Sequence, residues 1–288
     1  MKVAVFGATG TIGTALLPAL TRSHDVVALS RGEQKADGVK WLRADASDAE
    51  SVRRALEGVE VAYYLVHSLG TRDFEGRDRA AARTVAEEAA RAGLRQLVYL
   101  GGLGDDSPEL STHLRSRLET EQELASGAVP LTTLRAAIVI GRGSAGFETI
   151  VALVDRLPAM VCPRWVGVRT QPIAIADVVE YLAGVCGHPQ AIGESFDAGG
   201  PEAMTYRKMI ERVGAERGKR PLIVEVPVLT PRLSSYWLHL VTPVKASVAR
   251  PLIEGLRNET VAKDERIREL IPLELTPFDV AVRAALDD

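Results

Sequence analysis

The sequence predicts an α/β protein with a doubly wound parallel sheet and a smaller C-terminal substrate domain. Through the first 140 residues, short β-rich runs alternate with Ala-rich helical stretches, which is typical of βαβ units. Apolar runs such as Val-Ala-Tyr-Tyr-Leu-Val, residues 61–66, indicate strands that are covered on both faces. A glycine-rich turn directly follows the first run, as it does in Rossmann-type sheets.

Each expected strand is an apolar run between turn residues. Six runs supply the sheet: residues 2–6, 26–30, 40–44, 59–66, 97–100 and 131–140. The clearest helix covers Ala80 to Arg91, because it lacks helix breakers and its apolar positions recur near every 3.6 residues. Gly93 stands where the C-terminal cap of that helix belongs.

The pattern changes after Ile140, where prolines divide the chain into short pieces. Beyond them we expect a strand–helix unit over residues 171–183, a strand-like run at 224–228 and a helix over 277–286. We assign residues 1–185 to the Rossmann-type domain and residues 186–288 to the smaller domain. The chain is expected to cross between the two more than once.

Composition and charge argue against several classes of protein. A formal net charge of −3 and a pI near 6.0 provide no positive field for nucleic acid. No run of about 18 uncharged apolar residues occurs, so we expect no membrane-spanning helix. The N-terminus lacks the pattern of a secretory signal, which predicts a cytoplasmic protein. Cys162 and Cys186 fit neither metal nor disulfide spacing, so we expect no metal and two reduced core thiols.

The turn from Gly7 to Gly13, Gly-Ala-Thr-Gly-Thr-Ile-Gly, carries the strongest functional signal. The first glycine permits a tight turn, the second lets the backbone approach a pyrophosphate, and the third allows close packing of helix and strand. The N-terminus of the following helix offers free N–H groups to the anion. Glycines needed only for a tight turn would not explain this βαβ context. We therefore expect a dinucleotide site made by Gly7, Thr9, Gly10, Thr11, Ile12 and Gly13.

A second stretch, residues 141–146, also fits the pattern GxGxxG and also follows an apolar run. It lacks a following βαβ unit and a carboxylate placed to hold a ribose. We therefore interpret it as a flexible loop near the cleft and not as a second pyrophosphate site.

The end of the second strand bears on the choice between NAD(H) and NADP(H). A carboxylate there would hold the ribose 2′-hydroxyl and repel a 2′-phosphate, but this chain has Ser30 and Arg31. A guanidinium matches phosphate oxygens, so NADP(H) is favoured and NAD(H) is the alternative. In that alternative Arg31 is a solvated surface charge and Glu33 takes the ribose. Asp45, after the third strand, is expected to neighbour the adenine.

These segments resemble the short-chain dehydrogenase/reductase superfamily, in particular its atypical, NmrA-like NAD(P)H-binding branch, which is related to extended epimerases and dehydratases. The resemblance covers about residues 1–200. It rests on the glycine turn, Leu-Ser-Arg at 29–31, Arg-Ala-Asp at 43–45, Leu-Val-Tyr-Leu-Gly-Gly at 97–102 and Gln-Pro-Ile-Ala-Ile-Ala-Asp-Val-Val at 171–179. It implies a Rossmann-type domain that binds a nicotinamide dinucleotide.

Reductases of that superfamily use a tyrosine, a lysine one helical turn later and a hydroxyl residue after the fifth strand. The matching positions here are His113, Arg117 and the pair Gly101-Gly102, so all three usual groups are absent. His113 and Arg117 are four residues apart and share a helix face, so the imidazole could replace the phenol as a proton donor. A nearby arginine would lower the pKa of that imidazole. Otherwise His113 is a partly exposed helix residue.

Further candidates follow the fourth strand and lie in the C-terminal region. Val66 and His67 are at the carboxyl edge of the sheet, where ligands of such folds bind, so we expect them to contact cofactor or substrate. Alternatively, His67 is a strand-end residue satisfied by the backbone. The aromatic stretch containing Tyr236, Trp237 and His239 is interpreted as core or lid packing.

Two functions from different classes fit these observations. The first is an NADP(H)-dependent oxidoreductase that acts on a small, fairly apolar carbonyl or enone, with the second domain closing over it. The second is a non-catalytic NADP(H)-binding regulatory or scaffold protein, because the usual acid, base and hydroxyl are absent. Peripheral membrane attachment through residues 234–256 is disfavoured, since prolines interrupt any helix there and its cationic face is sparse.

Overall fold

The computed structural model describes residues 1–32, 34, 38–68, 74–104, 110–226 and 255–287. Its centre is a seven-stranded sheet in the order β11-β6-β5-β4-β1-β2-β3, and every neighbouring pair in it is parallel. This arrangement confirms the predicted doubly wound α/β fold. The strands are β1 (Lys2–Phe6), β2 (Asp25–Ser30), β3 (Lys40–Arg43), β4 (Val61–Tyr64), β5 (Gln96–Gly102), β6 (Leu131–Ala136) and β11 (Ser195–Ala198).

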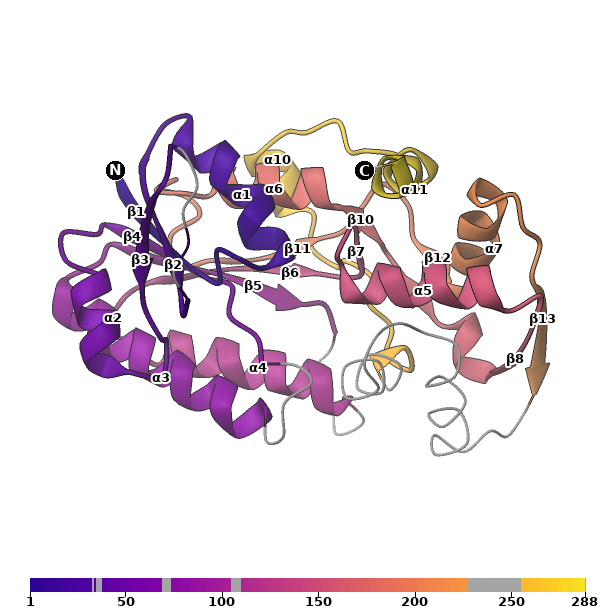
Figure 1. The fold of residues 1–288 in the computed structure, drawn as a ribbon, viewed down its shortest axis with the longest axis horizontal. Coiled ribbons are helices and arrows are strands. Elements are labelled where there is room, and N and C mark those ends of the chain that lie inside the picture. The colour runs from indigo at the N-terminus through magenta and orange to yellow at the C-terminus, as the bar shows by residue number, and fades with distance from the viewer. Residues whose placement is uncertain (33, 35–37, 69–73, 105–109, 227–254, 288) are drawn as a thin grey trace.

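Helices cover both faces of this sheet (Figure 1). Along β1, Val3 and Val5 pack toward one face and Ala4 and Phe6 toward the other, as the two-residue period of a strand requires. The first face is covered by α1 (Thr11–Thr21), α6 (Ile175–Gly184) and α10 (Arg266–Leu270). The second face is covered by α2 (Ala49–Ala55), α3 (Phe74–Ala92) and α4 (Thr112–Ala125).

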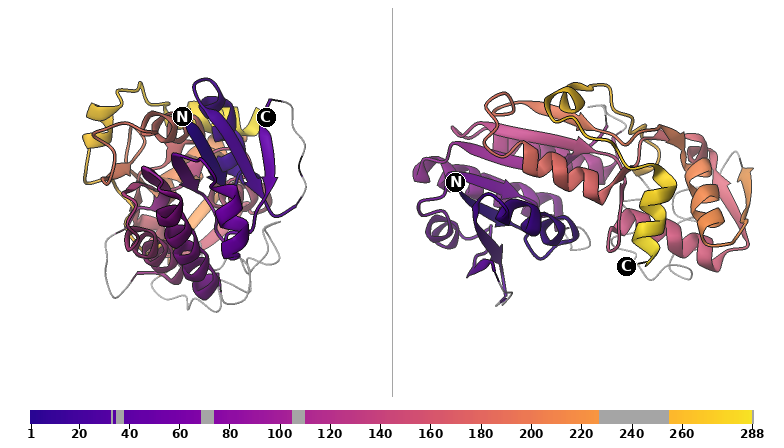
Figure 2. Two further views of the ribbon diagram at one scale, coloured as in Figure 1. Left: turned by 90° about the vertical axis from the view of Figure 1, so that its left-hand side faces the viewer. Right: turned by 90° about the horizontal axis from the view of Figure 1, so that it is seen from above.

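A third hydrophobic core lies beyond the carboxyl ends of the strands, at one end of the molecule in Figures 1 and 2. Its helices are α5 (Ala145–Arg156), α7 (Tyr206–Glu216) and α11 (Phe278–Asp287), with the 3-10 helix η1 (Arg164–Gly167). Three two-stranded sheets accompany them: β7 (Val139–Ile140) with β10 (Ile173–Ala174), β9 (Arg169–Thr170) with β12 (Met204–Thr205), and β8 (Ala159–Pro163) with β13 (Leu222–Val226).

Several expected elements differ from the structure in their bounds. The run 131–140 is not one strand: β6 stays in the large sheet, whereas β7 leaves it to pair with β10. No glycine or proline within residues 131–140 marks this break in the sequence. The helix expected from Ala80 already begins at Phe74, and Gly93 ends it with a φ of +72°. The strand expected at 224–228 starts at Leu222, and residues 227–228 lie outside the described residues.

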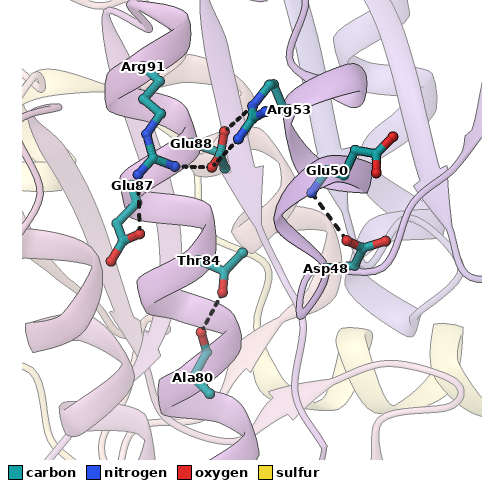
Figure 3. Close-up of polar contacts among 8 residues, drawn as sticks. All are labelled: Asp48, Glu50, Arg53, Ala80, Thr84, Glu87, Glu88 and Arg91. Carbon is teal, nitrogen blue, oxygen red and sulfur yellow. Dashed lines mark hydrogen bonds and ion pairs between the residues drawn. The ribbon is translucent and has the colours of Figure 1, made fainter.

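The buried carboxylate of Glu88 joins helices α2 and α3 (Figure 3). It accepts hydrogen bonds from Arg53 Nε at 2.9 Å and Nη2 at 3.3 Å, and it also pairs with Arg91. Hydrogen bonding to Arg53 lowers the pKa of Glu88. Asp48 caps α2 by accepting the backbone N–H of Glu50 at 3.1 Å. These contacts fix the position of α3, which carries a carboxylate into the site described below.

Both cysteines, Cys162 and Cys186, are buried and free, as expected. None of the helices in the described part of the chain is long and apolar enough to span a bilayer. Glu33, the aromatic stretch with Tyr236, Trp237 and His239, and all of residues 234–256 except the last two lie outside the described residues.

Candidate cofactor and substrate site

The three glycines of the first turn occupy different environments. Gly7 has a φ of +81°, and a Cβ there would lie 2.7 Å from the carbonyl oxygen of Leu65 in the neighbouring chain segment. A Cβ on Gly13 would lie 2.7 Å from Ala8 Cα, so the start of α1 packs directly on the turn. Gly10 is exposed, and a Cβ on it would meet only Gly7 O, at 3.3 Å. Gly7 and Gly13 are thus required for packing, whereas Gly10 leaves the backbone open to an approaching group.

The N-terminus of α1 is suited to an anion. Gly10 is its N-cap, no described side chain caps it, and its first turn contains no acidic residue. Unpaired N–H groups and the helix dipole therefore face the space above the turn. Thr9 is exposed, and Thr11 and Ile12 are half-buried and line the adjoining cavity. The residues present fit the pyrophosphate of a dinucleotide.

The predicted ribose and adenine residues lie at the ends of β2 and β3, beside the turn. Ser30 ends β2 and accepts the N–H of Gly32 at 3.3 Å, and Arg31 is exposed. Asp45 Oδ1 accepts hydrogen bonds from the backbone N–H of Ser47 at 3.0 Å and from its hydroxyl at 2.7 Å. These bonds are the main cause of its lowered pKa, and the nearby charge of Arg31 contributes. A cation and an anion are therefore close together on an accessible edge.

A cavity of about 520 Å³ extends from the glycine turn along the carboxyl ends of the strands. The large sheet and α4 form one wall, with Leu65, His67, Leu100, His113 and Arg117. The third core forms the other wall, and its side chains are mostly apolar: Ile138, Val139, Ile150, Leu153, Trp165, Tyr206 and Ile210. Trp165 and Tyr206 meet edge to face, with ring centroids 6.3 Å apart. The cavity therefore joins the cofactor turn to an apolar chamber.

Two histidines that the sequence singles out separately come together in this cavity. The rings of His67, after β4, and His113, in the first turn of α4, have centroids 5.2 Å apart. His67 Nδ1 lies 2.7 Å from Asp78 Oδ2, and the second oxygen of Asp78 accepts the backbone N–H of Ser68 at 2.9 Å. His67 Nε2 and His113 Nδ1 are buried and have no hydrogen-bond partner among the described residues.

Burial is the main cause of the lowered pKa values of both imidazoles. It lowers the pKa of His67, which the hydrogen bond to Asp78 opposes. It also lowers the pKa of His113 well below its ordinary value, with smaller contributions from His67 and then Arg117. Both rings are therefore neutral near pH 7 in the protein alone.

Arg117 is held against β5 and does not point freely into the cavity. Its Nη2 donates to the carbonyl oxygen of Leu100, and its Cζ lies 5.0 Å from the centroid of the Tyr99 ring. Gly102, at the usual hydroxyl position, has little room for a side chain, because a Cβ would lie 3.0 Å from Leu114 Cδ2. The structure thus places no serine, tyrosine or lysine of the usual set at these positions.

Other residues complete the description of the site. Val66 packs against the core beneath α2 and α3 and is not among the residues that line the cavity. Sequence reasoning missed Asp78, which is only 1% exposed on α3. The only sign of it in the sequence is an acidic residue in the first part of the helix that follows His67. It also missed Trp165 and Tyr206, since single aromatic residues in short segments resemble ordinary core residues.

The second glycine-rich stretch lies directly beside the first. The hydroxyl of Thr11 donates to Gly143 O at 2.8 Å, and the loop begins α5 at Ser144. Gly143 N–H donates to Glu148 Oε1 at 3.0 Å, so a carboxylate already occupies this part of the loop. The stretch therefore lines the cavity, but its last two residues, Ala145 and Gly146, belong to α5 and not to the flexible loop that was expected.

Comparison with known proteins agrees with this geometry. Residues 7–139 match the NAD(P)H-binding protein family. The chain is 24% identical over 212 residues to subunit 9 of the NADH dehydrogenase [ubiquinone] 1 alpha subcomplex, a mitochondrial protein of Mus musculus. That match covers 68% of this chain but only 56% of the mouse protein.

Several solved structures share the whole fold. The NADPH-dependent quinone oxidoreductase QOR2 of Escherichia coli, in complex with NADPH, superposes with a TM-score of 0.79 at 20% identity, covering 100% of both chains. The triphenylmethane reductase of Citrobacter sp., in complex with NADP(H), gives a TM-score of 0.77 at 19% identity and covers 99% of this chain and 100% of that one.

Proposed function

We propose that this protein is an NADP(H)-dependent oxidoreductase that reduces a small, fairly apolar carbonyl, enone or quinone. The observation that carries this proposal is the continuity of the cavity, which leads from the cofactor turn to a chamber with apolar walls and two neutral imidazoles. Pockets of this kind bind apolar small molecules and orient them with a few polar groups.

Residues of the first domain would hold the cofactor in the following way. N–H groups at the start of α1 would bind the pyrophosphate, and Gly10 would allow its close approach. Arg31, exposed at the end of β2, would pair with a 2′-phosphate, and Asp45 would neighbour the adenine. When bound in its reduced form, the cofactor supplies a hydride.

Residues of the other wall would hold the substrate. Ile150, Leu153 and the edge-to-face pair of Trp165 and Tyr206 would exclude water and bind an apolar ring. The substrate oxygen would lie at the imidazoles of the opposite wall. Among the described residues, His67 Nε2 and His113 Nδ1 have no hydrogen-bond partner, and both rings line the cavity. The activities named for the E. coli and Citrobacter structures, on a quinone and on triphenylmethane dyes, support an aromatic substrate for this cavity.

The first experiment is calorimetric titration with NADPH and NADH. We expect NADPH to bind more tightly, and Arg31→Ala to remove most of the difference, since a charge-assisted contact contributes about 1.5–3 kcal/mol, or roughly tenfold to a hundredfold in affinity. Arg22→Ala is the control, because Arg22 is another exposed arginine, at the C-terminal end of α1 and away from the glycine turn. Equal affinities for NADPH and NADH in the native protein would contradict the NADP(H) preference.

The second experiment follows NADPH oxidation over a panel of quinones, enones, aldehydes and cationic triarylmethane dyes. We expect turnover with apolar aromatic members of the panel and none with charged sugars or hydroxy acids. Trp165→Ala should raise KM for those substrates by about tenfold, since it removes part of the apolar wall but leaves the cofactor turn unchanged.

A non-catalytic NADP(H)-binding role is the second candidate. It is favoured by the replacement of the usual hydroxyl, phenol and ammonium by Gly102, His113 and Arg117. The similarity to an NADH dehydrogenase subunit, a component of a larger assembly, points the same way. Tight NADPH binding without turnover on any member of the panel would select this role over the oxidoreductase.

A further inference from the structure

The buried Asp78 and the half-buried His67 and His113 form an array from the interior of the protein to the cavity. Asp78 is 1% exposed and contacts His67 Nδ1 at 2.7 Å, and the ring of His67 is 5.2 Å from that of His113. Phe74 closes one side of His67 with a perpendicular ring at 6.2 Å. Both histidines line the cavity.

The hydrogen-bonding state of His67 follows from its partner. An ionised carboxylate accepts only, so His67 carries its proton on Nδ1, and its Nε2 is left with a lone pair. That lone pair is buried without a described partner, and so is Nδ1 of the neighbouring His113. Two buried nitrogens without hydrogen-bond partners, on adjacent rings, lower the stability of the fold. One proton shared between them would give both a partner.

Among the residues that the structure describes, few other charged or titratable groups act on the pair. Arg117 from α4 disfavours protonation of both rings, whereas Asp78 from α3 favours it on His67. Tyr64 from β4 and Tyr99 from β5 also lie near Asp78, but burial raises the pKa of both phenols, that of Tyr99 to about 12. Asp78 is therefore the group that places an added proton on His67.

We propose that Asp78, His67 and His113 act as one proton-donating unit for the reduction, with Asp78 as the positioning residue and His113 as the residue that delivers the proton to the substrate oxygen. This inference rests on the oxidoreductase function proposed above. It assigns a role to Asp78 and accounts for the absence of a tyrosine at position 113.

In each turnover one proton passes from the histidine pair to the substrate oxygen. In the loaded state His67 is protonated on both nitrogens, donates Nδ1–H to Asp78 and donates Nε2–H to His113 Nδ1, so that His113 carries its own proton on Nε2. As the carbonyl carbon gains a hydride from a reduced nicotinamide, the C=O π bond breaks and its oxygen takes the proton from His113 Nε2. The proton between the rings then passes to His113 Nδ1. Both rings end neutral, and solvent supplies the next proton.

The pH dependence has a definite sign. Because burial lowers the pKa of the pair, the loaded state is lost as pH rises through a value below 6.5, and reduction should be faster on the acidic side. Asp78→Asn removes the anion that favours the protonated form. The profile of kcat/KM should then move to lower pH.

The test combines histidine nitrogen spectroscopy with kinetics. The chain contains five histidines, so their ring 15N signals can be resolved individually and assigned by substitution. In the native protein we expect neutral His67 as the Nδ1–H tautomer, and in Asp78→Asn a loss of that preference. Kinetically, Asp78→Asn and His113→Phe should each lower kcat at pH 7 by about a hundredfold, and the double variant should lose little more, with NADPH affinity within twofold of native.

Glu88→Gln is the matched control, because Glu88 is equally buried on the same helix but pairs with Arg53 and Arg91. It should leave the His67 tautomer and the pH profile unchanged. An unchanged His67 tautomer in Asp78→Asn, or losses that multiply in the double variant, would overturn the inference in an active enzyme. Failure of the native protein to oxidise NADPH would instead count against the proposed function, and the nitrogen spectra would still decide whether Asp78 sets the state of His67.

Discussion

Gly10 and Gly13, three positions apart in the same turn, should give opposite phenotypes when each is changed to alanine. At Gly10 the backbone has a φ of −77°, and a Cβ would meet only Gly7 O, at 3.3 Å. The fold should tolerate Gly10→Ala at a cost below about 1 kcal/mol, since an N-cap alanine is only moderately unfavourable. The methyl group would stand between the helix N-terminus and the phosphates. We expect NADPH affinity to fall by about tenfold to a hundredfold, equivalent to about one charge-assisted hydrogen bond.

At Gly13 the added methyl group meets backbone atoms that cannot rotate away. Its Cβ would lie 2.7 Å from Ala8 Cα and 2.9 Å from Ala8 C. Overpacking of this kind costs about 1–3 kcal/mol, which corresponds to a fall in Tm of roughly 3–10 °C for a protein of this size. Calorimetric titration and thermal unfolding of both variants are the measurements. A Gly10→Ala protein that binds NADPH normally, or one as unstable as Gly13→Ala, would refute this division of roles.

Three further expectations concern the body of the protein. Tyr63→Phe should lower stability by about 1–2 kcal/mol, seen in urea unfolding, because the buried Tyr63 hydroxyl donates to Leu182 O at 2.7 Å and its loss leaves that carbonyl unsatisfied. Glu88→Gln should reduce the loss of Tm between pH 7 and about pH 3, since the pKa of Glu88 is lowered in the fold and its contribution is present above the unfolded pKa and lost as pH falls; an unchanged slope would contradict this. Cys162 should react slowly with a thiol reagent at pH 8 until the protein is unfolded, because burial raises its pKa to about 11.

The sequence was most informative where local chemistry and chain order coincide. Six of the seven sheet strands follow from short β-rich runs, and the glycine turn follows from its position between a strand and a helix, whereas β11 was not expected. The C-terminal glycine of α3 was predicted because only a residue tolerant of positive φ ends a helix in that way. All of these are properties of neighbouring residues.

The parts that could not be predicted depend on contacts between distant segments. His67 and His113 were both candidates, but only the fold shows that their rings are neighbours, because β4 and α4 are far apart in sequence. Asp78 resembles any other charged residue on a helix with many charges until its burial is known. The break after Ala136 was hidden because no glycine or proline interrupts the run, and the partner of its second half, β10, lies more than thirty residues further on.

The last strand of the large sheet has a consequence for how the chain becomes stable. β11 arrives more than fifty residues after β6, to which it is paired, and the N–H of Thr133 donates to Glu194 O at 2.9 Å. A fragment ending at residue 139 would leave β6 as an open edge with unpaired amide groups and a bare apolar face where α6 packs. The segment that matches the NAD(P)H-binding family, residues 7–139, is therefore shorter than the smallest unit expected to fold. Ribosomal synthesis must pass residue 198 before all seven strands of the sheet can pair.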